Sequence, residues 1–124
     1  MTKRVLIADD EPNIVTALEY MLQKRGYEVR TVQNGTQALT EIEQFGPDLV
    51  LLDVMMPAIN GYEVCQRIRE DPALGHLKII MLTAKGRDLD VAKGLALGAD
   101  AYVTKPFAIK QLLDQVTQLL GEGR

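Results

Sequence analysis

The sequence has one cysteine, no tryptophan and no long apolar run, and each of these shortages excludes a class of protein. A single cysteine cannot build a disulfide framework or a cysteine-based zinc site, and it fits a protein of the reducing cytoplasm. Four tyrosines and two phenylalanines do not suggest a surface for stacking single-stranded bases. The apolar runs fall well short of the roughly 20 residues of a membrane helix, and the first is also too short for a secretion signal.

An excess of positive charge is also missing. The 124 residues include 14 Lys and Arg against 17 Asp and Glu, which gives a formal net charge of −3. Direct binding to nucleic acid is therefore not expected. The hydrophobic fraction of 47% and the charged fraction of 25% are ordinary for a globular protein, and the length fits one domain. We expect residues 1–124 to form a single domain, with no output domain in this chain and no membrane association.

Short apolar runs alternate with helical patterns along the chain. In each gap between runs, apolar residues recur at the three- and four-residue spacing of an amphipathic helix, most weakly over Leu89–Leu97, where Gly94 interrupts. Gly26, Gly46 and Gly98 are typical of helix ends. Continuous apolar runs are typical of parallel strands buried on both faces, so the pattern predicts an α/β domain with a parallel sheet and five helices. The five predicted strands are Val5–Ala8, Tyr27–Val32, Leu49–Leu52, Lys78–Leu82 and Ala101–Thr104.

Polar residues suited to metal or phosphate chemistry stand at the ends of four of the five predicted strands. Ligands of an open parallel sheet bind beyond the carboxyl ends of its strands. Carboxylates crowded about 5 Å apart repel by on the order of 3 kcal/mol, which favours a hard divalent cation such as Mg²⁺. A carboxylate beside a metal can attack phosphorus, and lysine can bind a phosphoryl oxygen. The residues concerned are Asp9, Asp10, Glu11, Asp53, Thr83 and Lys105.

Each of these residues also has a purely structural interpretation. The acids at positions 9–11 could favour the start of the first helix, and Asp53 could be a turn residue. Thr83 could cap the next helix, and Lys105 could be a solvated surface lysine. Their joint placement at one edge of one predicted sheet favours a shared site over four separate coincidences.

Four segments of the chain resemble the receiver domain of two-component response regulators. In order, they are V-L-I-A-D-D-E-P, P-D-L-V-L-L-D-V-M-M-P-A-I-N-G-Y-E-V-C, I-I-M-L-T-A and G-A-D-A-Y-V-T-K-P-F, and the likeness covers essentially the whole chain. The resemblance implies a flavodoxin-like (βα)5 three-layer sandwich whose parallel sheet has the order 2-1-3-4-5. It also implies a phosphoacceptor switch that catalyses only its own phosphorylation and dephosphorylation, rather than an enzyme.

The resemblance further implies which residues accept the phosphoryl group and hold the metal. Asp53 matches the phosphorylated aspartate, Asp10 the direct metal ligand and Asp9 the acid that holds metal-bound water. With Asp53 and the backbone carbonyl of Met55, they would bind Mg²⁺, with Mn²⁺ as an alternative. The side chains of Met55 and Lys85 match positions that tune the lifetime of the phosphate.

Other matched positions concern the response to phosphorylation. Thr83 matches the hydroxyl that turns toward the phosphoryl group, and Lys105 the lysine that pairs with it. Tyr102 matches an aromatic switch on the output face formed by the fourth helix, fifth strand and fifth helix. The bond between Lys105 and Pro106 matches a cis peptide of the family.

Partners and assembly follow from the same resemblance. A sensor histidine kinase or a phosphotransfer protein is the expected phosphodonor, and the output is expected through an effector protein or a domain outside this chain. Lys93 and Asp100 match charged residues of a family dimer interface, but Ala101 and Gln115 replace two others. Because charge complementarity specifies such interfaces, we expect a monomer or a weak dimer.

Three other functions remain as alternatives. An aspartyl-phosphate phosphatase of the haloacid dehalogenase type would need D-x-D after the first strand and a cap domain. A flavodoxin would need a Ser/Thr-rich phosphate loop where this chain has acids. A receiver-like scaffold that works without phosphorylation is the third, and the complete set of acids, threonine and lysine argues against it.

Overall fold

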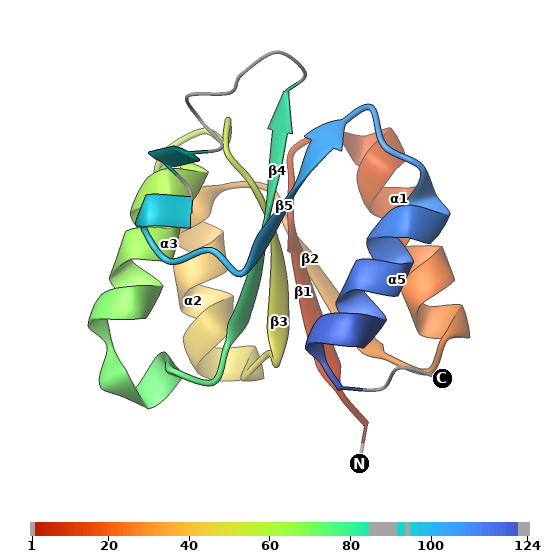
Figure 1. Cartoon of the computed structure of the whole chain (residues 1–124), viewed down its shortest axis with the longest axis horizontal. Coiled ribbons are helices and arrows are strands. Elements are labelled where there is room, and N and C mark those ends of the chain that lie inside the picture. The colour runs from red at the N-terminus through yellow and green to blue at the C-terminus, as the bar shows by residue number, and fades with distance from the viewer. Residues whose placement is uncertain (1, 85–91, 94, 122–124) are drawn as a thin grey trace.

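A computed structural model describes residues 2–84, 92–93 and 95–121 of the chain. Five parallel strands form one sheet in the order β2-β1-β3-β4-β5, which confirms the flavodoxin-like topology. They are β1 (Arg4–Ala8), β2 (Glu28–Val32), β3 (Leu49–Asp53), β4 (Lys78–Ala84) and β5 (Ala101–Lys105). The helices are α1 (Pro12–Lys24), α2 (Gly35–Phe45), α3 (Gly61–Glu70) and α5 (Ile109–Leu119), with the 3₁₀ turn η1 (Pro72–Leu74). Helices α2 and α3 cover one face of the sheet, and α1 and α5 cover the other (Figure 1).

The two faces of the sheet bury two separate apolar layers. Along β1, Leu6 and Ala8 pack toward α2 and α3, whereas Val5 and Ile7 pack toward α1 and α5. Every residue of the central strand β3 is buried, as the continuous apolar run predicted. Edge strand β2 is mostly exposed. The middle of the sheet is therefore rigidly held from both sides, and its carboxyl edge is the place where polar groups emerge.

Local signals set the ends of the helices. Pro12 occupies the first position of α1, where its missing N–H costs nothing, and the Asn34 side chain accepts the Gln37 N–H at the start of α2. Gly26 and Gly46 follow α1 and α2 with φ values of 93° and 65°, a left-handed conformation that a glycine adopts without a steric penalty. These two predicted helix ends are confirmed.

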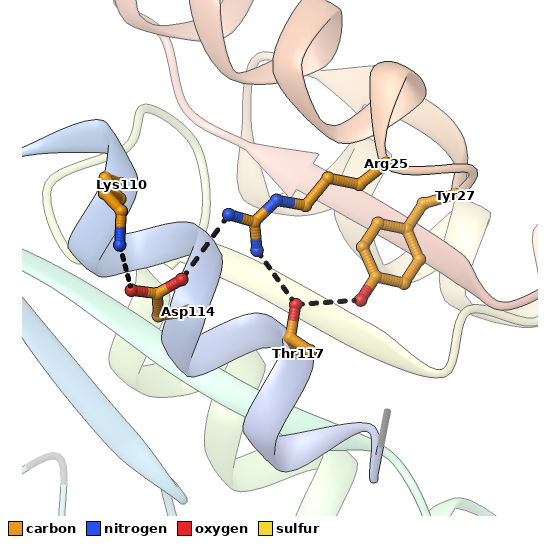
Figure 2. Close-up of polar contacts among 5 residues, drawn as sticks. All are labelled: Arg25, Tyr27, Lys110, Asp114 and Thr117. Atoms are coloured by element: carbon orange, nitrogen blue, oxygen red, sulfur yellow. Dashed lines mark hydrogen bonds and ion pairs between the residues drawn. The ribbon is translucent and has the colours of Figure 1, made fainter. Parts of the chain in front are cut away.

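A polar network attaches α5 to the end of α1 (Figure 2). The Arg25 guanidinium donates to Thr117 Oγ1 at 3.1 Å and pairs with Asp114 at 3.4 Å, and Asp114 also pairs with Lys110. The Tyr27 hydroxyl lies 3.2 Å from the same Thr117 oxygen. The Tyr27 N–H donates to the carbonyl oxygen of Leu22 on α1 at 3.2 Å, and the second strand begins at Glu28, one residue later than predicted.

Strand β1 begins one residue earlier than predicted, at Arg4, and three other strands run further at their carboxyl ends. Strands β3 and β5 each extend by one residue and β4 by two, so that Asp53, Thr83 and Lys105 belong to the strands rather than to the loops after them. The predicted helix over Leu89–Leu97 lies partly outside the described residues; residues 92–93 and 95–96 are helical, and Gly98 follows with a φ of 103°. Within the described ranges, every helix is too short or too polar to span a lipid bilayer.

One residue of the loop between β3 and α3 is held in a conformation that favours glycine. Ala58 has a φ of 68°, and the left-handed region costs a residue with a Cβ atom about 1–2 kcal/mol. We expect Ala58→Gly to raise the free energy of unfolding by about 0.5–1 kcal/mol, because relief of strain exceeds the added entropy of the unfolded chain. Urea denaturation would measure the change.

Ala73→Gly is the matched control for this substitution. Ala73 is also exposed, but it lies within η1 and Ala58 is the non-glycine residue with a positive φ in the described part of the chain. The Ala73→Gly protein should be less stable than the wild type, because glycine adds entropy to the unfolded chain and no strain is relieved. An Ala58→Gly protein that loses as much stability as the Ala73→Gly protein would show that the loop is unstrained.

Candidate functional site

The parallel register brings the carboxyl ends of β1, β3, β4 and β5 to one edge of the sheet. Ala8 lies opposite Leu52, Asp53 opposite Leu82, and Ala84 opposite Lys105. Residues from positions 9 to 105 of the chain thus meet at a single place, at the top of the view in Figure 1.

Three aspartates form a compact cluster at this edge. Oxygen atoms of Asp9, Asp10 and Asp53 all lie within 4.8 Å of one another. Asp9 is fully buried and Asp53 is 5% exposed, whereas Asp10 faces solvent. Carboxylate oxygens at this spacing, open to water on one side, are the donors that Mg²⁺ prefers, and the residues present therefore fit this ion.

Lys105 supplies the positive charge within the cluster. Its Nζ atom lies 2.6 Å from Glu11 Oε1, 2.9 Å from Asp9 Oδ2 and 3.5 Å from Asp53 Oδ2. Burial by itself would lower the pKa of this ammonium, but the bonds to Glu11 and Asp9 outweigh burial and raise the pKa. The interpretation of Lys105 as a solvated surface lysine is wrong, because its side chain is only 15% exposed.

The Asp53 carboxyl is unusually reluctant to ionise. Burial, followed by the neighbouring charge of Asp9, raises its pKa from 3.8 to about 6, although Lys105 and the Met55 N–H oppose the shift. The Met55 N–H donates to Asp53 Oδ1 at 3.2 Å, which orients the carboxyl group. A cation at the aspartate cluster would remove the repulsion and favour the ionised, nucleophilic form.

Thr83 presents a buried hydroxyl at the same edge. The residue is 2% exposed, and its Oγ1 atom has no hydrogen-bond partner among the described residues. It follows Leu82, which is paired with Asp53, and lies opposite Thr104 of β5. A buried hydroxyl without a partner is costly, so a ligand with oxygen acceptors would be favoured beside it.

The other predicted positions are only partly described. The Met55 side chain is exposed beside Asp53, and Tyr102 on β5 is about one-third exposed. The peptide bond between Lys105 and Pro106 is cis. Lys85 lies outside the described residues. The roles assigned to all of these residues stay predictions.

The sequence indicates Glu11 only as one of the acids at the end of the first strand and gives it no role of its own, whereas the structure pairs it with Lys105. Two glycines of the site were missed altogether. At Gly35 and Gly61, a side chain would collide with the carbonyl oxygens of Ile59 and Asp53 respectively. The signal for Gly61 was present in the sequence, as a glycine eight residues after the candidate acceptor, but the collision is visible only in the folded chain.

A flavodoxin-like sheet with buried acids, a free hydroxyl and a lysine at its carboxyl edge defines a phosphoacceptor class of signalling domain. A family model described as the response regulator receiver domain matches residues 5–117, and the chain belongs to this family. Receiver domains accept a phosphoryl group in two-component signalling, and the described fold is that of such a signalling module.

Individual relatives agree with this assignment. The chain is 44% identical over 120 residues to the alkaline phosphatase synthesis transcriptional regulatory protein PhoP of Bacillus subtilis (strain 168), with 97% of this chain and 49% of the relative covered. It spans about half the length of the curated relatives it matches.

Solved structures show the same fold over the whole chain. A putative response regulator from Chloroflexus aurantiacus J-10-fl is 37% identical, with a TM-score of 0.92 and coverage of 98% of this chain and 99% of the other. The chemotaxis response regulator CheY4 of Vibrio cholerae is 30% identical, with a TM-score of 0.89 and coverage of 96% and 99%.

The raised pKa of Asp53 predicts a dependence of stability on pH. In metal-free buffer, the unfolded chain ionises Asp53 near pH 4, while the folded protein keeps the proton up to about pH 6. The stability that this protonated carboxyl contributes is therefore present below pH 4 and lost as the pH rises to 6. Asp53→Asn has no carboxyl group at this position and cannot lose this stability. The difference in free energy of unfolding between Asp53→Asn and the wild type should therefore shift in favour of the variant by about 2–3 kcal/mol from pH 4 to pH 6.

Urea denaturation at a series of pH values would measure this difference. Asp71→Asn, which removes an exposed carboxylate at the start of η1, is the matched control. A difference between Asp53→Asn and wild type that is constant from pH 4 to pH 6 would show that the folded protein does not perturb this carboxyl group.

Proposed function

We propose that this domain is a Mg²⁺-dependent phosphoacceptor switch that receives a phosphoryl group on Asp53 from a sensor histidine kinase or a phosphotransfer protein. The single observation that carries the proposal is the meeting of Asp53 with two further aspartates and Lys105 at one sheet edge. A similar set of groups at one edge of a sheet can bind a metal, present a nucleophile and neutralise a phosphoryl group.

Asp9, Asp10 and Asp53 would hold the metal, together with the carbonyl oxygen of Met55. Mn²⁺ offers the same preference for oxygen ligands. The bound ion would neutralise negative charge on the phosphoryl oxygens and on the aspartates. The chain itself holds Asp53 in place through the Met55 N–H and supplies the Lys105 ammonium.

In the transfer, an Asp53 oxygen forms a bond to phosphorus while the bond from phosphorus to the donor's imidazole nitrogen breaks. The electron pair of that bond stays with the imidazole. Lys105 lies close enough to Asp53 to bind a phosphoryl oxygen, and the Thr83 hydroxyl can donate a second hydrogen bond. Later attack of water on phosphorus releases inorganic phosphate and restores the Asp53 carboxylate.

The phosphodonor is proposed to dock next to this edge. An apolar groove of about 240 Å³ lies between α1 and the segment after β5, and Pro106 and Phe107, which follow Lys105 in the chain, line it. An apolar side chain of the donor protein would fill the groove while its phosphohistidine reaches Asp53.

The response to the phosphoryl group is proposed to run from Thr83 to Tyr102. If the Thr83 hydroxyl turns toward the phosphoryl oxygens, it leaves space that the Tyr102 ring can enter. Tyr102 is partly exposed on β5, so it has room to move. This coupling, the tuning of lifetime by Met55 and Lys85, and a location in the cytoplasm stay predictions.

Phosphorylation of Asp53 can be tested with acetyl phosphate and intact-mass measurement. Wild-type protein should gain one phosphoryl group with Mg²⁺ present and none with a chelator. Asp10→Asn should need more Mg²⁺, because one carboxylate of the cluster is gone. Asp71→Asn, at an exposed acid away from the cluster, should react as the wild type does. Equal uptake by Asp53→Asn would move the modified residue elsewhere.

The domain is proposed to comprise residues 1–124 and to be a monomer or a weak dimer. Both residues that match the family's dimer interface have partners within this chain. Asp100 Oδ2 accepts bonds from Arg69 at 2.7 Å and from the Ile79 N–H at 2.8 Å, and the Lys93 ammonium lies 4.6 Å from the centre of the Tyr62 ring. Because these contacts occupy both side chains within the chain, we expect neither side chain to pair with a second copy.

Light scattering at micromolar concentration should therefore give the mass of a monomer, with or without beryllofluoride to mimic the phosphoryl group. The matched variant is Lys93→Ala, which should leave the mass unchanged. A stable dimer in the wild type that Lys93→Ala disrupts would show that the interface forms despite Ala101 and Gln115.

A further inference from the structure

Glu11 makes the shortest contact of the site and has no part in the chemistry described so far. Its Oε1 atom lies 2.6 Å from Lys105 Nζ, closer than the nearest oxygen of Asp9 or Asp53. An ammonium group has three N–H donors, and these three carboxylates are the partners the described residues offer them. Glu11 therefore helps to decide where the Lys105 charge stands.

The backbone of Glu11 is held firmly at the start of α1. Its N–H donates to Asp9 Oδ1 at 2.9 Å, and its carbonyl oxygen accepts the Val15 N–H at 3.1 Å. It is the N-cap residue of α1, directly before Pro12. The carboxylate thus projects from a fixed helix end rather than from a flexible loop, and it can define a position for its partner.

The three carboxylates around Lys105 differ in what the reaction requires of them. In the proposed function Asp9 serves the metal and Asp53 becomes covalently modified, so neither remains a dedicated partner of the lysine. Glu11, whose side chain is 55% exposed, has no such competing task. A lysine side chain held in one place loses rotamer entropy, and the contact with Glu11 can offset this loss before any phosphodonor binds.

We propose that Glu11 is a positioning residue that holds the Lys105 ammonium beside Asp53 before the phosphoryl group arrives. The inference rests on the proposed function. A charge already in place when the phosphoryl group is transferred needs no reorganisation at that moment, which speeds the step. Glu11 itself touches neither the donor nor the metal in this arrangement and acts only through Lys105.

The alternative is that Glu11 slows phosphorylation. A carboxylate at the mouth of the site repels an anionic phosphodonor, and its removal would then speed phosphorylation. Glu11→Gln separates the two effects, because the amide keeps an oxygen acceptor for Lys105 but carries no charge.

The experiment measures the rate of phosphorylation by acetyl phosphate at saturating Mg²⁺. Glu11→Ala should slow the reaction about two- to fivefold, the size expected of a partly exposed charge pair. Glu11→Gln should fall between Glu11→Ala and wild type. The control is Glu63→Ala, which removes a carboxylate that also lies 2.6 Å from its partner, Arg67, but stands on α3 outside the cluster. It should react at the wild-type rate.

A double-mutant cycle shows whether Glu11 acts through the lysine. In a Lys105→Ala protein, the added Glu11→Ala change should have no further effect on the rate. The ¹⁵N signal of the Lys105 ammonium gives a second readout in unphosphorylated protein. It should be visible in the wild type, weaker in Glu11→Gln and lost through fast hydrogen exchange in Glu11→Ala.

The outcomes separate this inference from the proposed function. The positioning role is overturned if both Glu11 variants are phosphorylated faster than the wild type. It is also overturned if Glu11→Ala slows phosphorylation as much in the Lys105→Ala protein as in the wild type. Either result leaves Asp53 as the acceptor. A wild-type protein that takes up no phosphoryl group overturns the proposed function. In that case the ammonium signal still decides whether Glu11 orders Lys105.

Discussion

The repulsion among buried carboxylates at the end of β1 and β3 is the constraint on which the rest of the site depends. Two of the three aspartates are almost fully buried, and the charge they carry must be balanced. In this structure the Lys105 ammonium supplies the balance, from strand β5, which lies two positions from β3 and three from β1 in the sheet. A divalent cation bound at the aspartate cluster would balance this negative charge more completely. It would then compete with the Lys105 ammonium for the same carboxylates. This competition makes the site sensitive to what binds there.

The apolar layers of the domain strengthen this repulsion among the carboxylates. Strand β3 is buried along its whole length, so its last residue, Asp53, cannot escape into water. The same burial holds Thr83 at the end of β4 without a hydrogen-bond partner among the described residues. A core that was less completely packed would let water relieve both groups, and the pKa of Asp53 would return toward its ordinary value. The packing of the core thus keeps Asp53 and Thr83 in an environment that is unfavourable for a carboxylate and for a hydroxyl without a partner.

Polar ties between elements keep this edge in register with the rest of the fold. Arg69 on α3 donates to the carbonyl oxygens of Leu77 and Gly98 and to Asp100, which joins α3 to the segments that precede β4 and β5. On the opposite face, Arg25 and Tyr27 hold α5 through Thr117 (Figure 2). Both ties lie away from the aspartate cluster. In the described structure, the charged side chains at the carboxyl ends of the strands can therefore rearrange without breaking these contacts.

The sequence by itself determined the strands, both ends of α1 and the end of α2, and it indicated the chemical nature of the candidate site. Periodicity and length placed every strand within two residues, because burial on both faces requires continuous apolar runs. The acids, threonine and lysine at the strand ends indicated metal and phosphoryl chemistry for a similar reason, since parallel strands deliver their carboxyl ends to one edge. What the pattern left open was the order of the strands, which came from the resemblance to a family.

Only the tertiary structure decided how the charges are distributed within the site. Glu11 and Lys105 stand 94 positions apart, and no local pattern predicts that they form the shortest contact of the cluster. The pairing of Asp100 with Arg69 likewise depends on where α3 lies against the sheet. Periodicity records which face of an element is buried, whereas a contact between charged side chains depends on the distances among three or more elements, and these distances exist only in the folded chain.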